Sequence, residues 1–113
     1  MQNVKFSFKL TAKGKLANVF FFPENSDHTI RIETKDFKIW ENEEFELEVN
    51  NPFEYKLRVY GATGTDWEAI LNITDDNDES KEFIKWKGTT GDLSANTSER
   101  TNPVKNLPSQ LSV

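Results

Sequence analysis

The chain of 113 residues contains no cysteine, a single histidine, four prolines and five glycines. Without cysteine it can form no disulfide, no thiol nucleophile and no cysteine-ligated zinc site. No apolar run approaches the roughly 20 residues that a membrane-spanning helix needs, so membrane insertion is not expected. The first residues show no charged head followed by an apolar stretch, which predicts no export signal in the printed chain. An exported location is expected only if this chain is a mature or excised fragment of a longer protein.

Basic residues are too few and too scattered to suggest a nucleic-acid-binding surface. Fourteen Lys and Arg residues against nineteen Asp and Glu residues give a formal net charge of −5. Proteins that bind nucleic acid gather cations into a stripe that displaces counterions from phosphates. Here the cations are spread along strands that also carry glutamate. We therefore expect neither nucleic acid nor an anionic membrane surface as a partner, and we expect the acidic balance to favour solubility.

What the sequence does contain is period-two alternation of apolar and polar residues. Successive side chains on a strand point to opposite faces, so such a stretch predicts a strand with one buried and one wet face. No stretch repeats apolar residues at helical spacing for more than one turn. The pattern therefore predicts an all-β domain. The clearest alternation covers residues 4–10, 45–49, 53–59 and 67–73.

The strands are expected to be short and to be joined by turns. Ala12-Lys13-Gly14 is expected to close a hairpin between the first two strands, and Asn50-Asn51-Pro52 has the composition of a tight turn. Short strands with turn signals every 8–12 residues are typical of an antiparallel sandwich or barrel. In strand count the chain resembles the immunoglobulin and fibronectin type III architecture, which implies a β-sandwich of about seven to eight strands. We expect strands at about 3–11, 15–22, 28–34, 36–41, 44–50, 53–60, 66–74 and 81–87.

Two segments of different character are expected, residues 1–87 and residues 88–113. The first carries the alternating strands and is expected to form the β-sandwich domain. The second is rich in Thr, Ser, Asn, Gly, Lys and Pro, and such a composition buries too little apolar surface to offset the entropy of ordering it. It is therefore expected to be a polar tail or linker. The alternative is that it adds an edge strand to the sandwich.

Catalytic residues are difficult to assemble from this sequence. The only histidine, His28, follows Asp27, and neighbours on a strand point to opposite faces, so these two cannot pair without a bulge. The paired acids Glu46 with Glu48, and Asp66 with Glu68, share strand faces that are expected to face solvent. We therefore expect the protein not to be an enzyme.

One acidic loop is a candidate calcium site. Asp75, Asp76, Asn77, Asp78 and Glu79 are consecutive, and calcium prefers six to eight oxygen ligands. The spacing of an EF-hand loop is not completed further on, so ligands from another loop would be required. The candidate metal ligands are Asp75, Asn77, Asp78 and Glu79, and the competing interpretation is a hydrated hairpin tip. No other cofactor is expected.

Large aromatic side chains on polar strand faces are the remaining candidates for a binding site. On its predicted strand, Trp40 belongs to the face away from Phe37 and Ile39. On the last predicted strand, Phe83 belongs to the face away from Ile84 and Trp86. Tyr60 shares the polar phase of Lys56 and Arg58. Exposed aromatic rings with polar neighbours anchor protein partners or stack on sugar rings. The competing interpretation is that both faces of these strands are covered. The candidate contact residues are Trp40, Tyr60 and Phe83.

The run Phe20-Phe21-Phe22 interrupts strict alternation. Either its strand is buried on both faces, or one of the three rings sits at a bulge. The sequence does not distinguish these two cases.

Together these observations favour a non-catalytic β-sandwich that acts as an interaction module, of the protein–protein, surface-assembly or adhesion type. The alternative is a carbohydrate-binding or calcium-dependent ligand-binding domain that uses the 75–79 loop. Partners are therefore expected to be protein or carbohydrate, and the oligomeric state stays open.

Overall fold

The computed structural model describes residues 2–23, 30–36, 38–49, 53–74, 77–92, 97–105 and 107. Within these ranges the chain is all-β and contains no helix, and therefore none that could cross a membrane. The strands are β1 (Gln2–Ala12), β2 (Leu16–Pro23), β3 (Ile30–Arg31), β4 (Thr34–Asp36), β5 (Ile39–Val49), β6 (Phe53–Gly61), β7 (Asp66–Thr74), β8 (Ser80–Thr89) and β9 (Thr97–Lys105).

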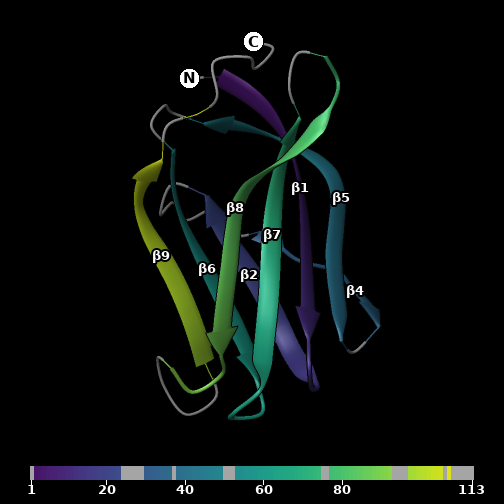
Figure 1. Cartoon of the computed structure of the whole chain (residues 1–113), viewed down its shortest axis with the longest axis vertical. Helices are drawn as coiled ribbons and strands as arrows, with labels where there is room; N and C mark the ends of the chain where they lie inside the picture. Colours follow the sequence, from purple (N-terminus) through teal and green to yellow (C-terminus); the bar gives the residue numbers. More distant parts are fainter. Residues whose placement is uncertain are drawn as a thin grey trace.

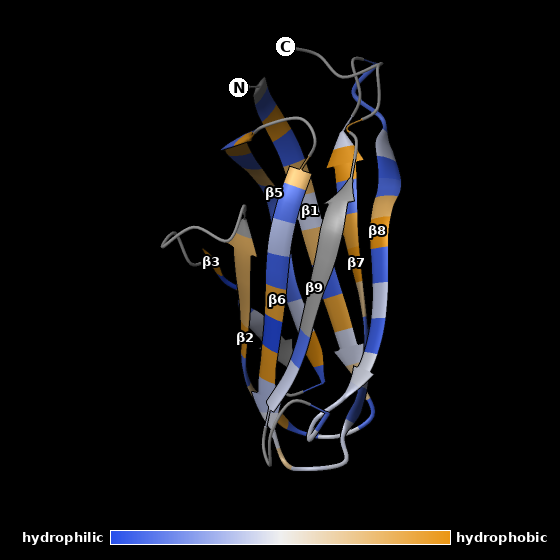
Figure 2. Ribbon diagram, turned by 90° about the vertical axis from the view of Figure 1, so that its left-hand side faces the viewer, coloured by the Kyte–Doolittle hydropathy of each residue, from blue (hydrophilic) through white to orange (hydrophobic). Residues whose placement is uncertain are grey.

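The strands form two antiparallel sheets that pack against each other (Figure 1). The five-stranded sheet has the order β4-β5-β1-β7-β8, and the four-stranded sheet has the order β3-β2-β6-β9. Their inner faces share one hydrophobic core. This arrangement is compatible with the predicted sandwich. The alternation that predicts it is visible along β6, where hydrophilic and hydrophobic residues follow one another (Figure 2).

Most connections between consecutive strands cross from one sheet to the other. The expected hairpin at Ala12-Lys13-Gly14 is wrong, because β1 pairs with β5 and β7, whereas β2 pairs with β3 and β6. Alternation shows that a strand has a buried face, but it does not show which sheet the strand joins. The turn chemistry at this point fits a crossing connection as well as a hairpin.

The expected strands at 36–41 and 44–50 are largely one strand, β5. Its pairing with β1 shifts register between Phe6, which lies opposite Phe45, and Phe8, which lies opposite Asn42. This irregularity accommodates the polar run that interrupts the alternation. A bulge lets a strand continue past an extra residue, so a break in periodicity is not always the end of a strand.

The segment after residue 87 contributes a strand to the four-stranded sheet. Within the described residues, Thr97–Lys105 forms β9 and pairs antiparallel with β6. Ser98 and Thr97 are buried where β9 begins. A Cβ at Gly88 would lie 2.5 Å from the Trp67 ring and 2.8 Å from the Ser98 hydroxyl oxygen. Glycine at position 88 therefore lets β8 and β9 approach each other around the Trp67 indole.

Aromatic side chains dominate the core between the sheets. The ring centroids of Phe6 and Phe53 are 5.5 Å apart, and those of Tyr55 and Trp86 are 5.2 Å apart. Aromatic pairs at such separations add to the stability gained by burying their area. The core aromatics are Phe6, Phe8, Phe21, Trp40, Phe53, Tyr55, Trp67, Phe83 and Trp86.

Candidate functional site

Trp40 is not on the surface, so the prediction that it faces outward is wrong. Its side chain is 4% exposed and belongs to the core. Trp40 lies directly opposite Leu10 of β1, and residues opposite each other on neighbouring strands share a face. Because Leu10 points inward, Trp40 does too. The sequence predicts the opposite direction for Trp40 if Phe37 and Ile39 are taken to point inward. Phe37 lies outside the described residues, and Ile39 is half-buried.

Phe83 is also buried, with 5% exposure, so its predicted outward position is wrong as well. The pairing of β7 with β8 shifts register here: Leu71 lies opposite Ile84, whereas Asn72 lies opposite Glu82. Phe83 is therefore the extra residue of a bulge. A bulge changes the direction of a side chain relative to simple alternation, and both Phe83 and Ile84 consequently point into the core.

Tyr60 lies on the outer face of the four-stranded sheet, in phase with Lys56 and Arg58. The inward positions of β6 are buried, whereas Lys56, Arg58 and Tyr60 are half-buried. The Phe20-Phe21-Phe22 run follows regular alternation. Phe21 is fully buried, and Phe20 and Phe22 lie on the outer face with Tyr60. We call the set of Phe20, Phe22, Arg31, Lys56, Arg58 and Tyr60 the aromatic–cationic face.

The three rings of this face lie close together at different inclinations. The centroids of Phe20 and Tyr60 are 5.8 Å apart with planes at 78°, an edge-to-face contact. Those of Phe20 and Phe22 are 6.4 Å apart with planes at 42°. The rings therefore form a contoured cluster in which Phe20 is central. Of these three rings only Tyr60 is predicted from the sequence as a contact residue; the common phase of Phe20 and Phe22 is the signal that marks the other two.

Cations surround this cluster. Phe20 lies between Arg31 of β3 and Arg58 of β6 in the sheet register, and Phe22 lies opposite Lys56. The Lys56 Nζ lies 5.4 Å from the centre of the Phe22 ring, within the range of a cation–π contact. The Arg31 Nη2 lies 3.5 Å from the Asn18 Oδ1, at the outer limit of a hydrogen bond.

Arg58 differs from the other two cations because it has a carboxylate partner. The Arg58 Nε donates to the Glu99 Oε2 at 2.8 Å, and its Nη2 forms an ion pair with the same oxygen. Its Nη1 lies 3.5 Å from the Tyr60 hydroxyl. The hydrogen bonds with Tyr60 and Glu99 raise the pKa of Arg58 above its ordinary value, at which a guanidinium is already charged throughout the physiological range.

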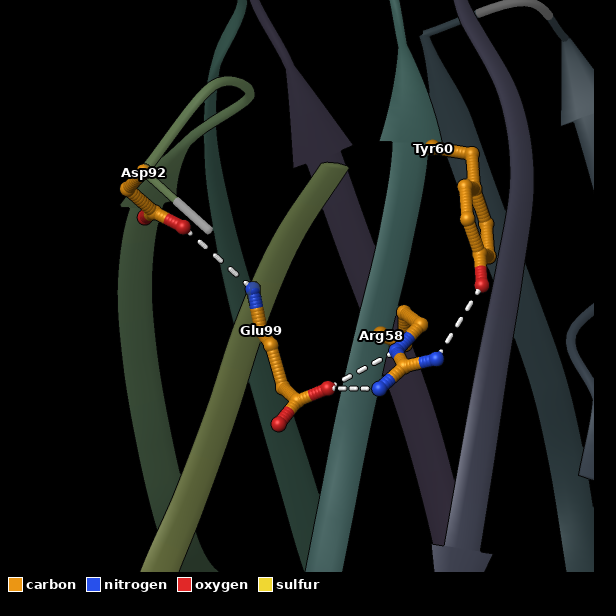
Figure 3. A network of polar contacts seen from close by, with 4 residues as sticks. All are labelled: Arg58, Tyr60, Asp92 and Glu99. Atoms are coloured by element: carbon orange, nitrogen blue, oxygen red, sulfur yellow. Dashed lines mark hydrogen bonds and ion pairs between the residues drawn. The ribbon is translucent and has the colours of Figure 1, made fainter. Parts of the chain in front are cut away.

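Asp92, in the turn that follows β8, holds the beginning of β9 in place (Figure 3). One of its carboxylate oxygens accepts a hydrogen bond from the Ser98 hydroxyl at 2.9 Å, and the other lies 3.3 Å from the Glu99 backbone nitrogen. Nearby, the buried Thr90 hydroxyl accepts from the Thr65 backbone N–H at 2.8 Å. The contact of Thr90 with Thr65 joins the turn after β8 to the turn before β7. The contacts of Asp92 with Ser98 and Glu99 hold the first residues of β9, and thereby place Glu99 beside Arg58.

The acidic loop is described only in part. Asp75 and Asp76 lie outside the described residues, and Asn77, Asp78 and Glu79 are exposed. Asp78 adopts a positive φ of 64°. Across the described part of the chain, no three His, Cys, Asp or Glu residues gather in a way that could hold a metal ion. The candidate calcium site therefore stays a prediction.

The acidic pairs on the other sheet face solvent. Glu46, Glu48, Asp66 and Glu68 are all exposed, as their strand phases predict. Glu68 lies 3.7 Å from the Lys87 ammonium. An open concavity of about 640 Å³ lies across the ends of β1, β7 and β8 and includes these two side chains. Asp27 and His28 lie outside the described residues.

Comparison of the chain with protein-family models, with curated proteins and with solved structures returned no match. Within the described residues, the outer face of β2 and β6 is where aromatic rings and cations gather at the surface.

Proposed function

We propose that this protein is a non-catalytic interaction module that binds a protein partner through its aromatic–cationic face. The observation that carries this proposal is the half-buried cluster of Phe20, Phe22 and Tyr60 with arginine and lysine beside it. Phenylalanine, tyrosine and arginine are enriched at the cores of protein interfaces, and tyrosine and arginine are among the residues that contribute most to binding energy. Rings that are only half-buried in the free chain leave apolar area for a partner to cover.

The inclination of the rings favours a protein partner over a polysaccharide. A sugar chain stacks best on rings that lie in one plane, whereas these planes are inclined at 42° and 78°. A contoured cluster fits separate side chains of a partner that enter between the rings. Carbohydrate is therefore the second candidate ligand for this face.

The sheet edges support the choice of a face over an edge. Strand addition requires a long, regular edge with unpaired backbone groups. Within the described residues, β3 and β4 have two and three residues. β8 carries a bulge and exposed lysines, and β9 contains Pro103, which has no backbone N–H. Each edge therefore carries a feature that discourages pairing with another strand.

We also infer an immunoglobulin-like arrangement with one insertion. In that architecture one sheet contains strands in the order B-E-D and the other contains C-F-G, with an optional strand beside C. If β1 is strand B, the orders β1-β5-β4 and β3-β2-β6-β9 follow this scheme. The β7–β8 hairpin then occupies the place beside strand B, where strand A would lie. This correspondence supports an immunoglobulin-like strand order.

Capture of the natural partner by matched variants tests the proposed function. The purified chain is immobilised and exposed to an extract of the cells that produce it, next to Phe22→Ser and Ile70→Ser variants. Ile70 is half-buried on the outer face of the other sheet and is the control. We expect a discrete protein to be retained by the wild type and Ile70→Ser, and to be lost from Phe22→Ser. Equal retention by all three folded chains, or retention by none, would contradict the proposal.

A further inference from the structure

We propose that the partner segment recognised by the aromatic–cationic face is acidic, with carboxylates placed beside apolar side chains. This inference rests on the proposed function and names the chemistry of the partner at the same surface.

Arg31 and Lys56 form no ion pair within the described part of the chain, whereas Arg58 is paired with Glu99. The cation of Lys56 is directed over the Phe22 ring, and Arg31 lies across β2 from Arg58 with Phe20 between them. The unpaired positive charge therefore lies on both sides of the two phenylalanine rings. Glu54, further along the same face of β6, is exposed and forms no ion pair with Lys56.

These cations lie beside three half-buried aromatic rings in a chain that carries a formal net charge of −5, whereas Lys9 and Lys85 of the other sheet flank only the aliphatic Ile70. On the outer face of the five-stranded sheet, lysines and glutamates are interspersed, and two of the lysines have carboxylates within 4 Å. Charge complementarity selects partners and speeds association, because like charges repel and opposite charges attract at long range. The half-buried ring cluster with its surrounding cations is therefore suited to an acidic partner segment.

The role of Arg58 follows from its pairing. Glu99 already satisfies its charge, so Arg58 is expected to hold the Tyr60 hydroxyl and the ring cluster in place. A partner carboxylate would have to compete with Glu99 for this guanidinium. Within the described part of the chain no carboxylate pairs with Arg31 or Lys56, and we expect these two residues to decide specificity.

A peptide titration with a charge reversal tests this inference. The probes are three flexible 12-residue peptides with the same leucine and phenylalanine positions and with glutamate, glutamine or lysine at the remaining positions. Binding to the full chain is followed by amide ¹H–¹⁵N shifts and by calorimetry. We expect the glutamate peptide to shift amides of β2 and β6 and to bind at least tenfold more tightly than the glutamine peptide. We also expect its affinity to fall as salt is added.

Charge-reversal variants then test whether Arg31 and Lys56 are the cations that bind the glutamate peptide. Arg31→Glu and Lys56→Glu should each weaken binding of the glutamate peptide at least fivefold, and the double variant should favour the lysine peptide. Lys85→Glu, at an exposed position of β8, changes the net charge equally and should leave affinity unchanged. Equal effects of all three substitutions would reduce the binding to non-specific attraction and overturn the inference.

The outcomes separate this inference from the proposed function. If the glutamate peptide fails to bind while Phe22→Ser still abolishes capture of the natural partner, the face is an interface but its partner is not acidic. If a sulfated oligosaccharide binds at β2 and β6 where the glutamate peptide does not, the face recognises a polyanionic sugar, and both proposals are wrong. If the spectra show that the chain associates with itself through this face, the partner is a second copy and the acidic-segment inference is wrong.

Discussion

At the residue scale, the position of a ring relative to its cross-strand neighbour decides whether it can bind a partner. Trp40 faces inward because Leu10 opposite it does, and Phe83 faces inward because it is the extra residue of a bulge. Tyr60 lies in a regular part of β6, so the phase of its strand is sufficient to predict that its side chain points outward. Alternation therefore predicts side-chain direction well within regular pairing once the inward phase is known. It fails for Phe83 because of the register shift, and for Trp40 because Ile39 pairs with the exposed Thr11 and does not mark the inward face.

Two substitutions of Trp40 test its place in the core. Removing a buried tryptophan leaves a cavity, so Trp40→Ala should lower the free energy of unfolding by about 3–5 kcal/mol. Trp40→Phe should cost clearly less, because phenylalanine keeps much of the apolar surface. Trp40→Phe also removes the indole Nε1–H, which has no hydrogen-bond partner in the described structure. Urea unfolding of both variants measures the difference. A loss below about 1 kcal/mol for Trp40→Ala would place this ring on the surface.

At the scale of elements, most strands could be predicted from the sequence, but their sheets could not. The expected strands at 3–11, 53–60, 66–74 and 81–87 lie within β1, β6, β7 and β8. The sequence does not show that the chain crosses between sheets after β1, because turn residues such as Gly14 serve both kinds of connection. β9 was hard to foresee, because its composition is polar and the contacts that fix its beginning come from Asp92, Ser98 and Glu99.

β9 is expected to be part of the cooperative unit, and a truncation tests this. A chain that ends at residue 92 loses the antiparallel partner of β6 and the carboxylate beside Arg58. We expect the free energy of unfolding to fall by about 1.5–3 kcal/mol or more, because the burial of the Leu107 side chain, which is 7% exposed, is lost together with the strand.

A chain that ends after Leu107 retains β9 and is the matched truncation. Comparison of the two by thermal and urea unfolding isolates the contribution of residues 93–107. Equal stability of both truncated chains would mean that β9 does not stabilise the sheet. The raised pKa of Arg58 means that its contribution is present below the unfolded-state pKa and is lost only in strong alkali. The Arg58 charge therefore adds no pH dependence to this comparison near neutrality.

At the scale of the whole molecule, the two outer sheet faces differ in character. The five-stranded sheet presents exposed lysines and glutamates, some of them paired. The four-stranded sheet presents half-buried rings beside Arg31, Lys56 and Arg58, and among the described residues only Arg58 of these three has an ion pair. The exposed acids at 46, 48, 66 and 68 could be predicted from alternation alone. The aromatic–cationic face could not, because its rings come from two strands that are neighbours only in the folded sheet.

Site-specific photocrosslinking in the cells that produce the protein tests the central claim most directly. A benzophenone side chain replaces Phe22 in one chain and Ile70, on the outer face of the five-stranded sheet, in another. We predict that irradiation joins a discrete partner protein to the chain labelled at position 22, and that the yield falls when Arg31→Glu is added. The chain labelled at position 70 should give no such product. The same product from both positions, or a product from position 70 alone, would contradict the assignment of the partner surface to β2 and β6.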